Sequence, residues 1–104
     1  MKSAQEETQD PLKVASNAYG LLMENDRVRV LRLFLKPGEK AAMHHHPDHV
    51  VYVVKGGRGQ LELSSGEKET MEMEKGKAMF LDAQSHEATN VGDTDLEFIV
   101  LELK

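Results

Sequence analysis

The sequence contains no cysteine, and this absence removes a class of chemistry. Without thiols the chain can form no disulfide, offers no thiol nucleophile and has no thiolate ligand for a metal. Any metal ion that its side chains bind must therefore be held by nitrogen and oxygen atoms.

Long apolar runs and an excess of basic residues are missing as well. No stretch approaches the roughly 20 apolar residues of a membrane-spanning helix, and the start, MKSAQEETQDP, lacks the hydrophobic region of a signal peptide. The formal net charge is −5, and no basic stripe suited to nucleic acid is visible. We therefore expect a cytoplasmic protein that binds neither membranes nor nucleic acids.

The length of 104 residues fits one domain. Residues 1–17 are polar, acidic and without a regular pattern, and Pro11 interrupts them. We expect them to form an N-terminal arm that is disordered or exchanges a strand with a neighbouring chain. Residues 18–104 are expected to form a single barrel.

Turn signals punctuate the chain after residue 18. Most lie about eight to eleven residues apart, which is typical of an all-β sandwich or barrel. They fall at Asn25-Asp26, Pro37-Gly38, Pro47-Asp48, Gly56-Gly57, Ser65-Gly66, Gly76 and Gly92-Asp93. No segment after Pro11 has a helical period, so helix should be nearly absent.

Several segments between these turns alternate between apolar and polar residues. Leu61 and Leu63 flank Glu62, and Met71 and Met73 are separated by a glutamate. Such alternation predicts strands with one buried face.

One segment, RVRVLRLFLK, changes the phase of its alternation. Val28 and Val30 share one parity, whereas Leu31, Leu33 and Leu35 share the other. We interpret this change as a bulge or as a strand that bends between two sheets.

Four of the five histidines lie close together in MHHHPDHVVYVVKGG, residues 43–57. On a strand, His44 and His46 project to the same face and His45 to the opposite one. Two imidazoles with this spacing can chelate one metal ion, although a histidine run on a surface strand has the same local pattern.

The fifth histidine, His86, lies in a second patterned stretch. It follows Gly76 by ten residues and precedes Asn90 by four. In the first stretch, Gly38 precedes the His-x-His group by five intervening residues, and Gly56 closes it. In these two motifs and their order, the sequence resembles the cupins over roughly residues 20–103.

The sequence departs from the cupin pattern in both motifs. His49 occupies the place of the usual glutamate, and the gap after His46 is one residue short. Asp82 and Gln84 stand where the second motif usually has proline and glycine. Because both parities of HVVYVVK are apolar, periodicity does not decide whether His49 faces the interior.

The resemblance implies an antiparallel jelly-roll fold with a metal between its sheets. Its implied ligands are His44, His46 and His86, with His49 as a fourth ligand. Nitrogen ligation suits a divalent transition metal (Fe, Zn, Ni, Cu or Mn) better than Mg or Ca. Exchanging the glutamate for histidine would raise the charge of the ion and its ligands from +1 to +2, which favours an anionic substrate. Small cupins also commonly form homodimers.

Other residues near the motifs have simpler roles. Glu87 follows His86 on a strand and should point away from the site. Asn90 is expected to secure a turn, and Tyr52 to pack across strands. Met71 and Met73 are expected to fill the core.

The leading functional hypothesis is a metal-dependent enzyme acting on a small, anionic organic substrate. The metal would stabilise an enolate or activate dioxygen, so dioxygenase is the first reaction class and isomerase or lyase the second. The HPD after the histidines and the ending VLELK also resemble small cupins assigned to β-alanine degradation. No general acid or base aimed at the metal can be identified from the sequence. The alternatives are a non-catalytic module that binds a small ligand or senses a metal, and a metal-free barrel.

Overall fold

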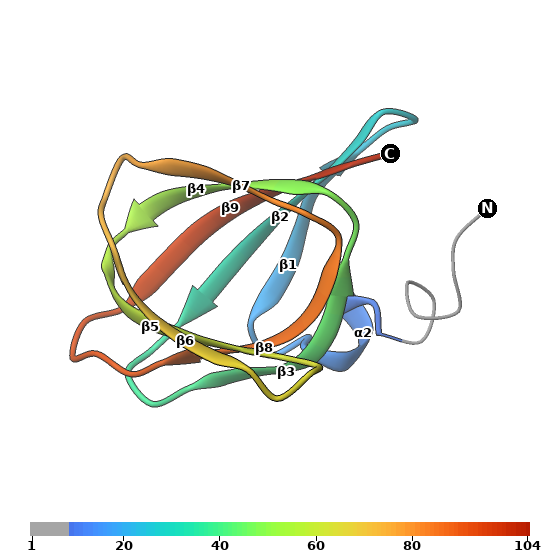
Figure 1. Cartoon of the computed structure of the whole chain (residues 1–104). Coiled ribbons are helices and arrows are strands. Elements are labelled where there is room, and N and C mark those ends of the chain that lie inside the picture. The colour runs from blue at the N-terminus through green and yellow to red at the C-terminus, as the bar shows by residue number, and fades with distance from the viewer. Residues whose placement is uncertain (1–8) are drawn as a thin grey trace.

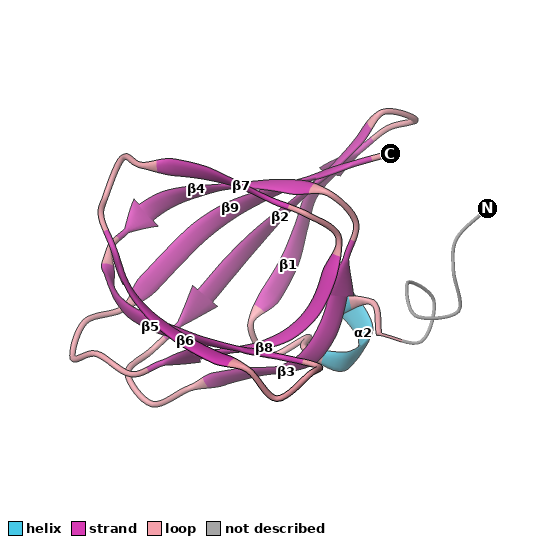
Figure 2. Ribbon diagram, in the orientation of Figure 1, coloured by secondary structure: helices cyan, strands magenta, loops and turns pink. Residues whose placement is uncertain are grey.

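The protein is described here by a computed structural model covering residues 9–104, which form a β structure with one short helix (Figures 1 and 2). In chain order its elements are α2 (Pro11–Val14), β1 (Tyr19–Glu24), β2 (Val28–Leu35), β3 (Lys40–His46), β4 (His49–Lys55), β5 (Gly57–Leu63), β6 (Lys68–Met73), β7 (Ala78–Leu81), β8 (Gln84–Asn90) and β9 (Leu96–Leu103). The α-helix spans four residues, so the expected all-β class is confirmed.

The strands of this described region form two sheets. One has the order β1-β2-β9-β4-β7 and the other the order β3-β8-β5-β6, and the pairs within them are antiparallel. Figure 1 shows the sheets as opposite walls of an open barrel. Strands distant in sequence become neighbours, because β2 pairs with β9 and β3 pairs with β8. This arrangement confirms the expected antiparallel jelly roll.

The burial of the side chains shows which residues of β4 face the interior of the barrel. His49, Val51 and Val53 are buried, whereas Tyr52 on the other parity is exposed. In β6, Met73 is buried as expected. The inward residues of β4 therefore begin with a histidine and continue as aliphatic core.

Three of the predicted turns depend on glycine. Gly38, Gly66 and Gly76 have φ angles of 84°, 93° and 86°. A residue with a Cβ atom rarely adopts this left-handed region, so glycine is the favoured residue at these positions. The turn signals therefore mark real strand ends.

Both interpretations of RVRVLRLFLK, a bulge or a strand that bends between two sheets, are wrong, because β2 lies within one sheet between β1 and β9. β2 pairs with β9 along its whole length without a register shift. The phase changes because Arg29 points inward with the leucines that follow it, while Val28 and Val30 lie on the outer face. The irregularity occurs in the neighbouring strand β1, between Leu21 and Met23.

The N-terminal segment packs against the barrel from residue 9 onward. Asp10 caps α2 by accepting a hydrogen bond from the backbone N–H of Leu12 at 2.9 Å, and Pro11 occupies the first turn. Pro11 and Ala15 are buried, and α2 lies against β1 and β3. Residues 9–17 of the expected arm are thus described packed on the barrel, and residues 1–8 of that expectation lie outside the described residues.

The core between the sheets changes from apolar to charged along β9. Its inward side chains run from Leu96 through Phe98 and Val100 to Glu102, which is 3% exposed. One end of the barrel is therefore apolar, and the other surrounds a buried carboxylate. In residues 9–104, no helix is long and apolar enough to cross a membrane.

Candidate metal centre

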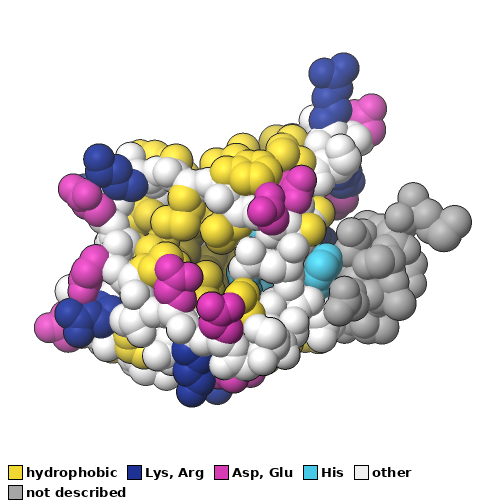
Figure 3. Space-filling model, viewed as in Figure 1, with side chains coloured by type: hydrophobic (Ala, Val, Ile, Leu, Met, Phe, Trp, Pro, Cys, Tyr) yellow, Lys and Arg dark blue, Asp and Glu magenta, His cyan; other side chains and the backbone are white. Residues whose placement is uncertain are grey.

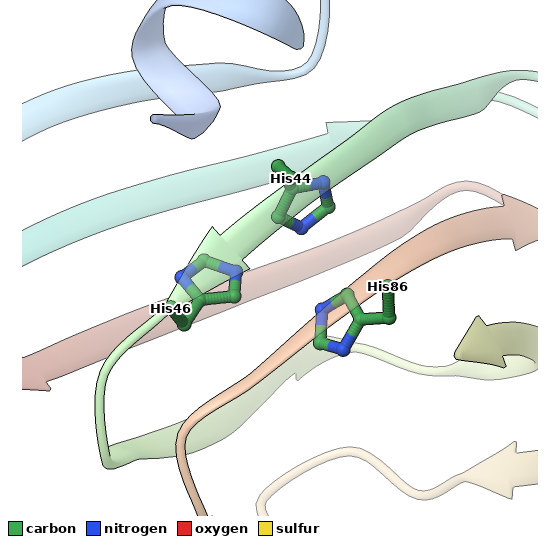
Figure 4. Close-up of side chains that lie close together, drawn as sticks. All are labelled: His44, His46 and His86. Carbon is green, nitrogen blue, oxygen red and sulfur yellow. The ribbon is translucent and has the colours of Figure 1, made fainter. Parts of the chain in front are cut away.

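Three histidines from the two sequence motifs lie together inside the barrel (Figure 4). β3 and β8 are neighbouring antiparallel strands, and His44 pairs directly with His86 across them. His46 follows on the same face of β3. One ligand atom from each imidazole lies within 4.8 Å of the others, and the three residues are buried. These histidines could hold a metal ion.

The fourth predicted ligand, His49, reaches the same region from the opposite sheet. It is 1% exposed, and its ring centroid lies 4.6 Å from that of His46 and 6.3 Å from that of His86. It is not one of the three histidines whose ligand atoms lie within 4.8 Å of one another. Its role as a ligand stays a prediction.

Two of the imidazoles are oriented by backbone carbonyls. Nδ1 of His44 lies 2.7 Å from the carbonyl oxygen of Ala42, and Nδ1 of His49 lies 2.7 Å from that of Pro47. Because a carbonyl can only accept, each Nδ1 carries the proton and donates. Nε2 of each ring is then left with the lone pair that a metal needs.

The other two imidazoles are oriented by side chains. Nδ1 of His46 lies 2.5 Å from Oε2 of Glu102, and Nδ1 of His86 lies 2.9 Å from Oε1 of Gln84. Both oxygens act as acceptors, so Nε2 is again the free nitrogen. A carboxylate or carbonyl behind each histidine is the usual support of a metal ligand.

Glu102 belongs to a buried cluster of charges. Its Oε1 accepts a hydrogen bond from Nε of Arg29 at 2.8 Å, and Nη1 of Arg29 donates to Oδ2 of Asp10 at 2.9 Å. All three residues are less than a tenth exposed. With both carboxylates ionised, the cluster carries a net charge of −1 behind His46. It offsets part of the positive charge expected after the loss of the usual glutamate.

Tyr19 is a site residue that the sequence interpretation missed. Its hydroxyl lies 3.1 Å from Nε2 of His44 and 3.2 Å from Nε2 of His46. It is the buried residue of β1, whose other five residues are exposed. Because YGLLME does not alternate, no periodicity marked Tyr19 as inward. The sequence does indicate that Glu102 faces inward, because Glu102 lies on the same face of the predicted strand LEFIVLEL as three apolar residues.

Burial keeps the imidazoles neutral. Loss of solvent is the largest effect in each case: it lowers the pKa of His44 to about 4 and that of His86 to about 2. It also lowers the pKa of His46 well below its ordinary value, and lowers that of His49. Burial, followed by the charge of Glu102, raises the pKa of the Tyr19 phenol. Near neutral pH the site thus presents neutral imidazoles, the form that binds metals.

The remaining motif residues lie away from this centre. His45 faces the opposite side of β3, where its Nδ1 contacts the hydroxyl of Ser85 at 3.0 Å. Glu87 points outward, within 3.5 Å of the Lys40 ammonium. Asn90 donates to the carbonyl of Leu35 at 2.9 Å, which confirms its expected structural role.

A cavity opens onto the histidines from the interior of the barrel. Its volume available to the centres of water molecules is about 50 Å³, enough for several waters or a small ligand. Tyr19, His46, His49 and His86 line one part, and the rest is mostly aliphatic and methionine side chains. In the part of the chain that the structure describes, no lysine or arginine belongs to this lining. Figure 3 shows the hollow, with hydrophobic walls and acidic side chains near its mouth.

Comparison with solved structures identifies similar barrels. A cupin domain from Bordetella pertussis is 27% identical with a TM-score of 0.76, covering 83% of this chain and 91% of that one. An RmlC-like cupin from Methanocaldococcus jannaschii is 21% identical with a TM-score of 0.65, covering 82% and 77%. A DMSP lyase from Ruegeria pomeroyi is 14% identical with a TM-score of 0.61, covering 86% of this chain and 48% of that one. The two less similar structures support the fold alone.

The family comparison covers most of the chain. No curated protein matches the sequence. The family model for the cupin domain matches residues 31–102, a range that contains all five histidines. This match and the jelly-roll topology confirm the resemblance drawn from the two histidine motifs. The chain is a small single-domain member of the cupin family.

Proposed function

We propose that the protein is a metal-dependent enzyme acting on a small organic molecule. The observation that carries this proposal is the common orientation of four buried imidazoles, each with Nδ1 against an oxygen. We assign His44, His46 and His86 as ligands and His49 as the fourth. A histidine cluster used only for packing would not need an oxygen against every Nδ1, an arrangement that leaves every Nε2 without a proton.

The side chains that line the cavity indicate which class of substrate would fit it. Its walls are mostly apolar, so the body of the substrate should be a short hydrocarbon or similar group. Its polar end, a carboxylate or carbonyl oxygen, would lie at the histidines. Because the described lining residues include no cation, an anionic end would depend on the metal for its counter-charge. This dependence favours a substrate with a single charged or polar end.

The reaction classes follow from what the site provides. When bound, the metal would polarise a substrate oxygen or activate dioxygen. The chain's own residues would bind and orient the substrate and exclude bulk water. Among residues 9–104, no aspartate or glutamate lines the cavity. This scarcity of proton-transfer groups ranks dioxygenase first and isomerase or lyase second. The DMSP lyase with a similar barrel is one example of lyase chemistry in this fold.

A binding module is the second candidate function. It is favoured by the same lack of a carboxylate in the cavity, since a sensor needs no proton transfer. In that case the metal site would hold a small ligand without turnover. Turnover of a bound compound, whether by dioxygen uptake or by isomerase or lyase chemistry, therefore separates the two functions.

We also propose a homodimer. The outer face of the five-stranded sheet carries apolar side chains that are partly or wholly exposed, among them Phe34, Val50, Tyr52, Ile99 and Leu101. A large apolar face of this kind is typical of an interface. Sedimentation should give twice the chain mass of 11.7 kDa, and Leu101→Lys should yield monomers. Monomeric wild-type protein would contradict this assembly.

The enzymatic proposal is tested by oxygen uptake. Wild-type protein loaded with ferrous iron would be incubated with a panel of short-chain carboxylates and β-diketones, and oxygen consumption would be recorded. We expect at least one compound to be consumed with oxygen, and His86→Ala to be inactive. A matched His45→Ala variant should keep the activity. Binding of panel members without any turnover would support the binding module instead.

A further inference from the structure

The phenol of Tyr19 contacts two imidazoles at the nitrogens that a metal would use. Its oxygen lies 3.1 Å from Nε2 of His44 and 3.2 Å from Nε2 of His46. The hydroxyl comes from β1, outside both histidine motifs, and the side chain is 6% exposed. Tyr19 also lines the cavity beside His86. It thus belongs to the metal centre by position, although no motif includes it.

The two contacts of the Tyr19 hydroxyl cannot both be hydrogen bonds, because only one donor proton is available for them. Nδ1 of His44 donates to a carbonyl and Nδ1 of His46 to the Glu102 carboxylate, so both neutral rings present a bare Nε2. The phenol has one proton and can donate to only one of them. The other contact would bring two lone pairs together. A cation held between the three atoms would resolve this conflict.

The distance of the Tyr19 oxygen from each of the two nitrogens suits a shared ion. Two ligands that are each about 2.1 Å from one metal lie about 3.0 Å apart at a right angle and about 3.4 Å apart at the tetrahedral angle. The two distances from the Tyr19 oxygen, 3.1 and 3.2 Å, fall between these values. The Tyr19 oxygen therefore already lies at a ligand-to-ligand distance from both nitrogens.

We propose that the phenol oxygen of Tyr19 is a ligand of the same metal ion as His44 and His46. This inference rests on the proposed metal site. On binding, the oxygen forms a bond to the metal and the phenol proton leaves to solvent. The resulting phenolate brings one negative charge to the ion. It thereby supplies from β1 the charge that the sequence lost when histidine took the glutamate position at residue 49.

Ferric iron gives a direct test because iron(III) phenolates absorb visible light. The protein would be loaded with ferrous iron without oxygen, oxidised by air and examined by absorption and resonance Raman spectroscopy. We expect a visible charge-transfer band and phenolate ring modes in the wild type. The chain has two tyrosines, which makes Tyr52→Phe, on the outer face, the matched control for Tyr19→Phe.

The outcomes separate this inference from the proposed metal site. Loss of the band in Tyr19→Phe but not in Tyr52→Phe, with iron affinity weakened about tenfold or more, would support the ligand role. Iron-loaded wild type without the band, or a band that survives in Tyr19→Phe, would overturn it and leave the histidine site standing. A wild type that binds no metal would overturn both. The Raman spectrum of the wild type decides the question even if Tyr19→Phe does not fold.

Discussion

Glu102, near the end of the last strand, lies 2.5 Å from Nδ1 of His46, a residue 56 positions earlier in the chain. The carboxylate fixes the ring so that Nε2 points toward the other histidines. The same carboxylate is held in turn by Arg29 at 2.8 Å. Strand β9 thus supports the metal centre although it contributes none of the proposed ligands.

Removing this support should weaken the site. Glu102→Gln keeps the size of the side chain and an oxygen that can accept from Nδ1, but it removes the charge that makes His46 more basic. We expect metal affinity to fall about 10- to 100-fold in a chelator competition assay. Glu97→Gln is the control, because Glu97 lies on the outer face of the same strand, paired with Arg32. Equal losses in both variants would show that the carboxylate behind His46 has no special role.

His49 should strengthen the site without being essential to it. It reaches the centre from the opposite sheet and lies nearest to His46. We expect His49→Ala to keep about one metal per chain but to bind it about tenfold more weakly. His49→Glu, which restores the residue usual in the family, should recover tight binding. Unchanged affinity in His49→Ala would exclude the residue as a ligand.

The metal-free protein should lose stability as the pH falls below about 6.5. Burial depresses the folded-state pKa values of His44 and His86 below the ordinary value of 6.5. The unfolded chain therefore binds protons first, and stability present above pH 6.5 is lost as the pH falls toward the folded-state values. Each such histidine contributes about 1.4 kcal/mol per pH unit.

Urea unfolding between pH 7.5 and 5 would measure this slope, above the range in which most carboxylates titrate. His44→Gln should reduce the slope. His45→Gln should leave it unchanged, since His45 lies on the other face of β3. A free energy of unfolding that stays flat across this range would mean that the buried imidazoles are not neutral in the fold.

Asn90 should matter for folding and not for metal binding. Its amide nitrogen donates to the carbonyls of Leu35 and Thr94, at 2.9 and 2.8 Å. Asn90→Ala removes both hydrogen bonds, and we expect it to cost about 2 kcal/mol and to lower Tm by roughly 10 °C. The metal content of the folded variant should equal that of the wild type. An Asn90→Ala variant that lost its metal but kept its full stability would contradict this structural role of Asn90.

The fold was predictable because its signals are local. Glycine at Gly38, Gly66 and Gly76 marks turns that need a left-handed backbone, and the alternation around Met73 marks a one-sided strand. These signals require no knowledge of which strands pair. The interpretation of β2 failed because alternation treats every charged residue as exposed, whereas Arg29 is buried between two carboxylates.

The supporting residues of the site were harder to predict. His44, His46 and His86 stand in recognisable motifs, and the pairing of β3 with β8 brings them together as expected. Tyr19 and Asp10 come from β1 and the N-cap of α2, where spacing gives no indication of what they face. Their placement depends on long-range strand pairing and on the packing of α2, which a local pattern does not encode.

The most direct test of the account is the metal content per chain. Untagged wild type, His86→Ala and His45→Ala would be prepared in parallel and measured by elemental analysis, before and after reloading with ferrous iron or zinc. We predict about one metal ion per chain in the wild type and in His45→Ala, and almost none in His86→Ala. A wild type that stays metal-free after reloading would contradict the metal centre, and with it the enzymatic proposal.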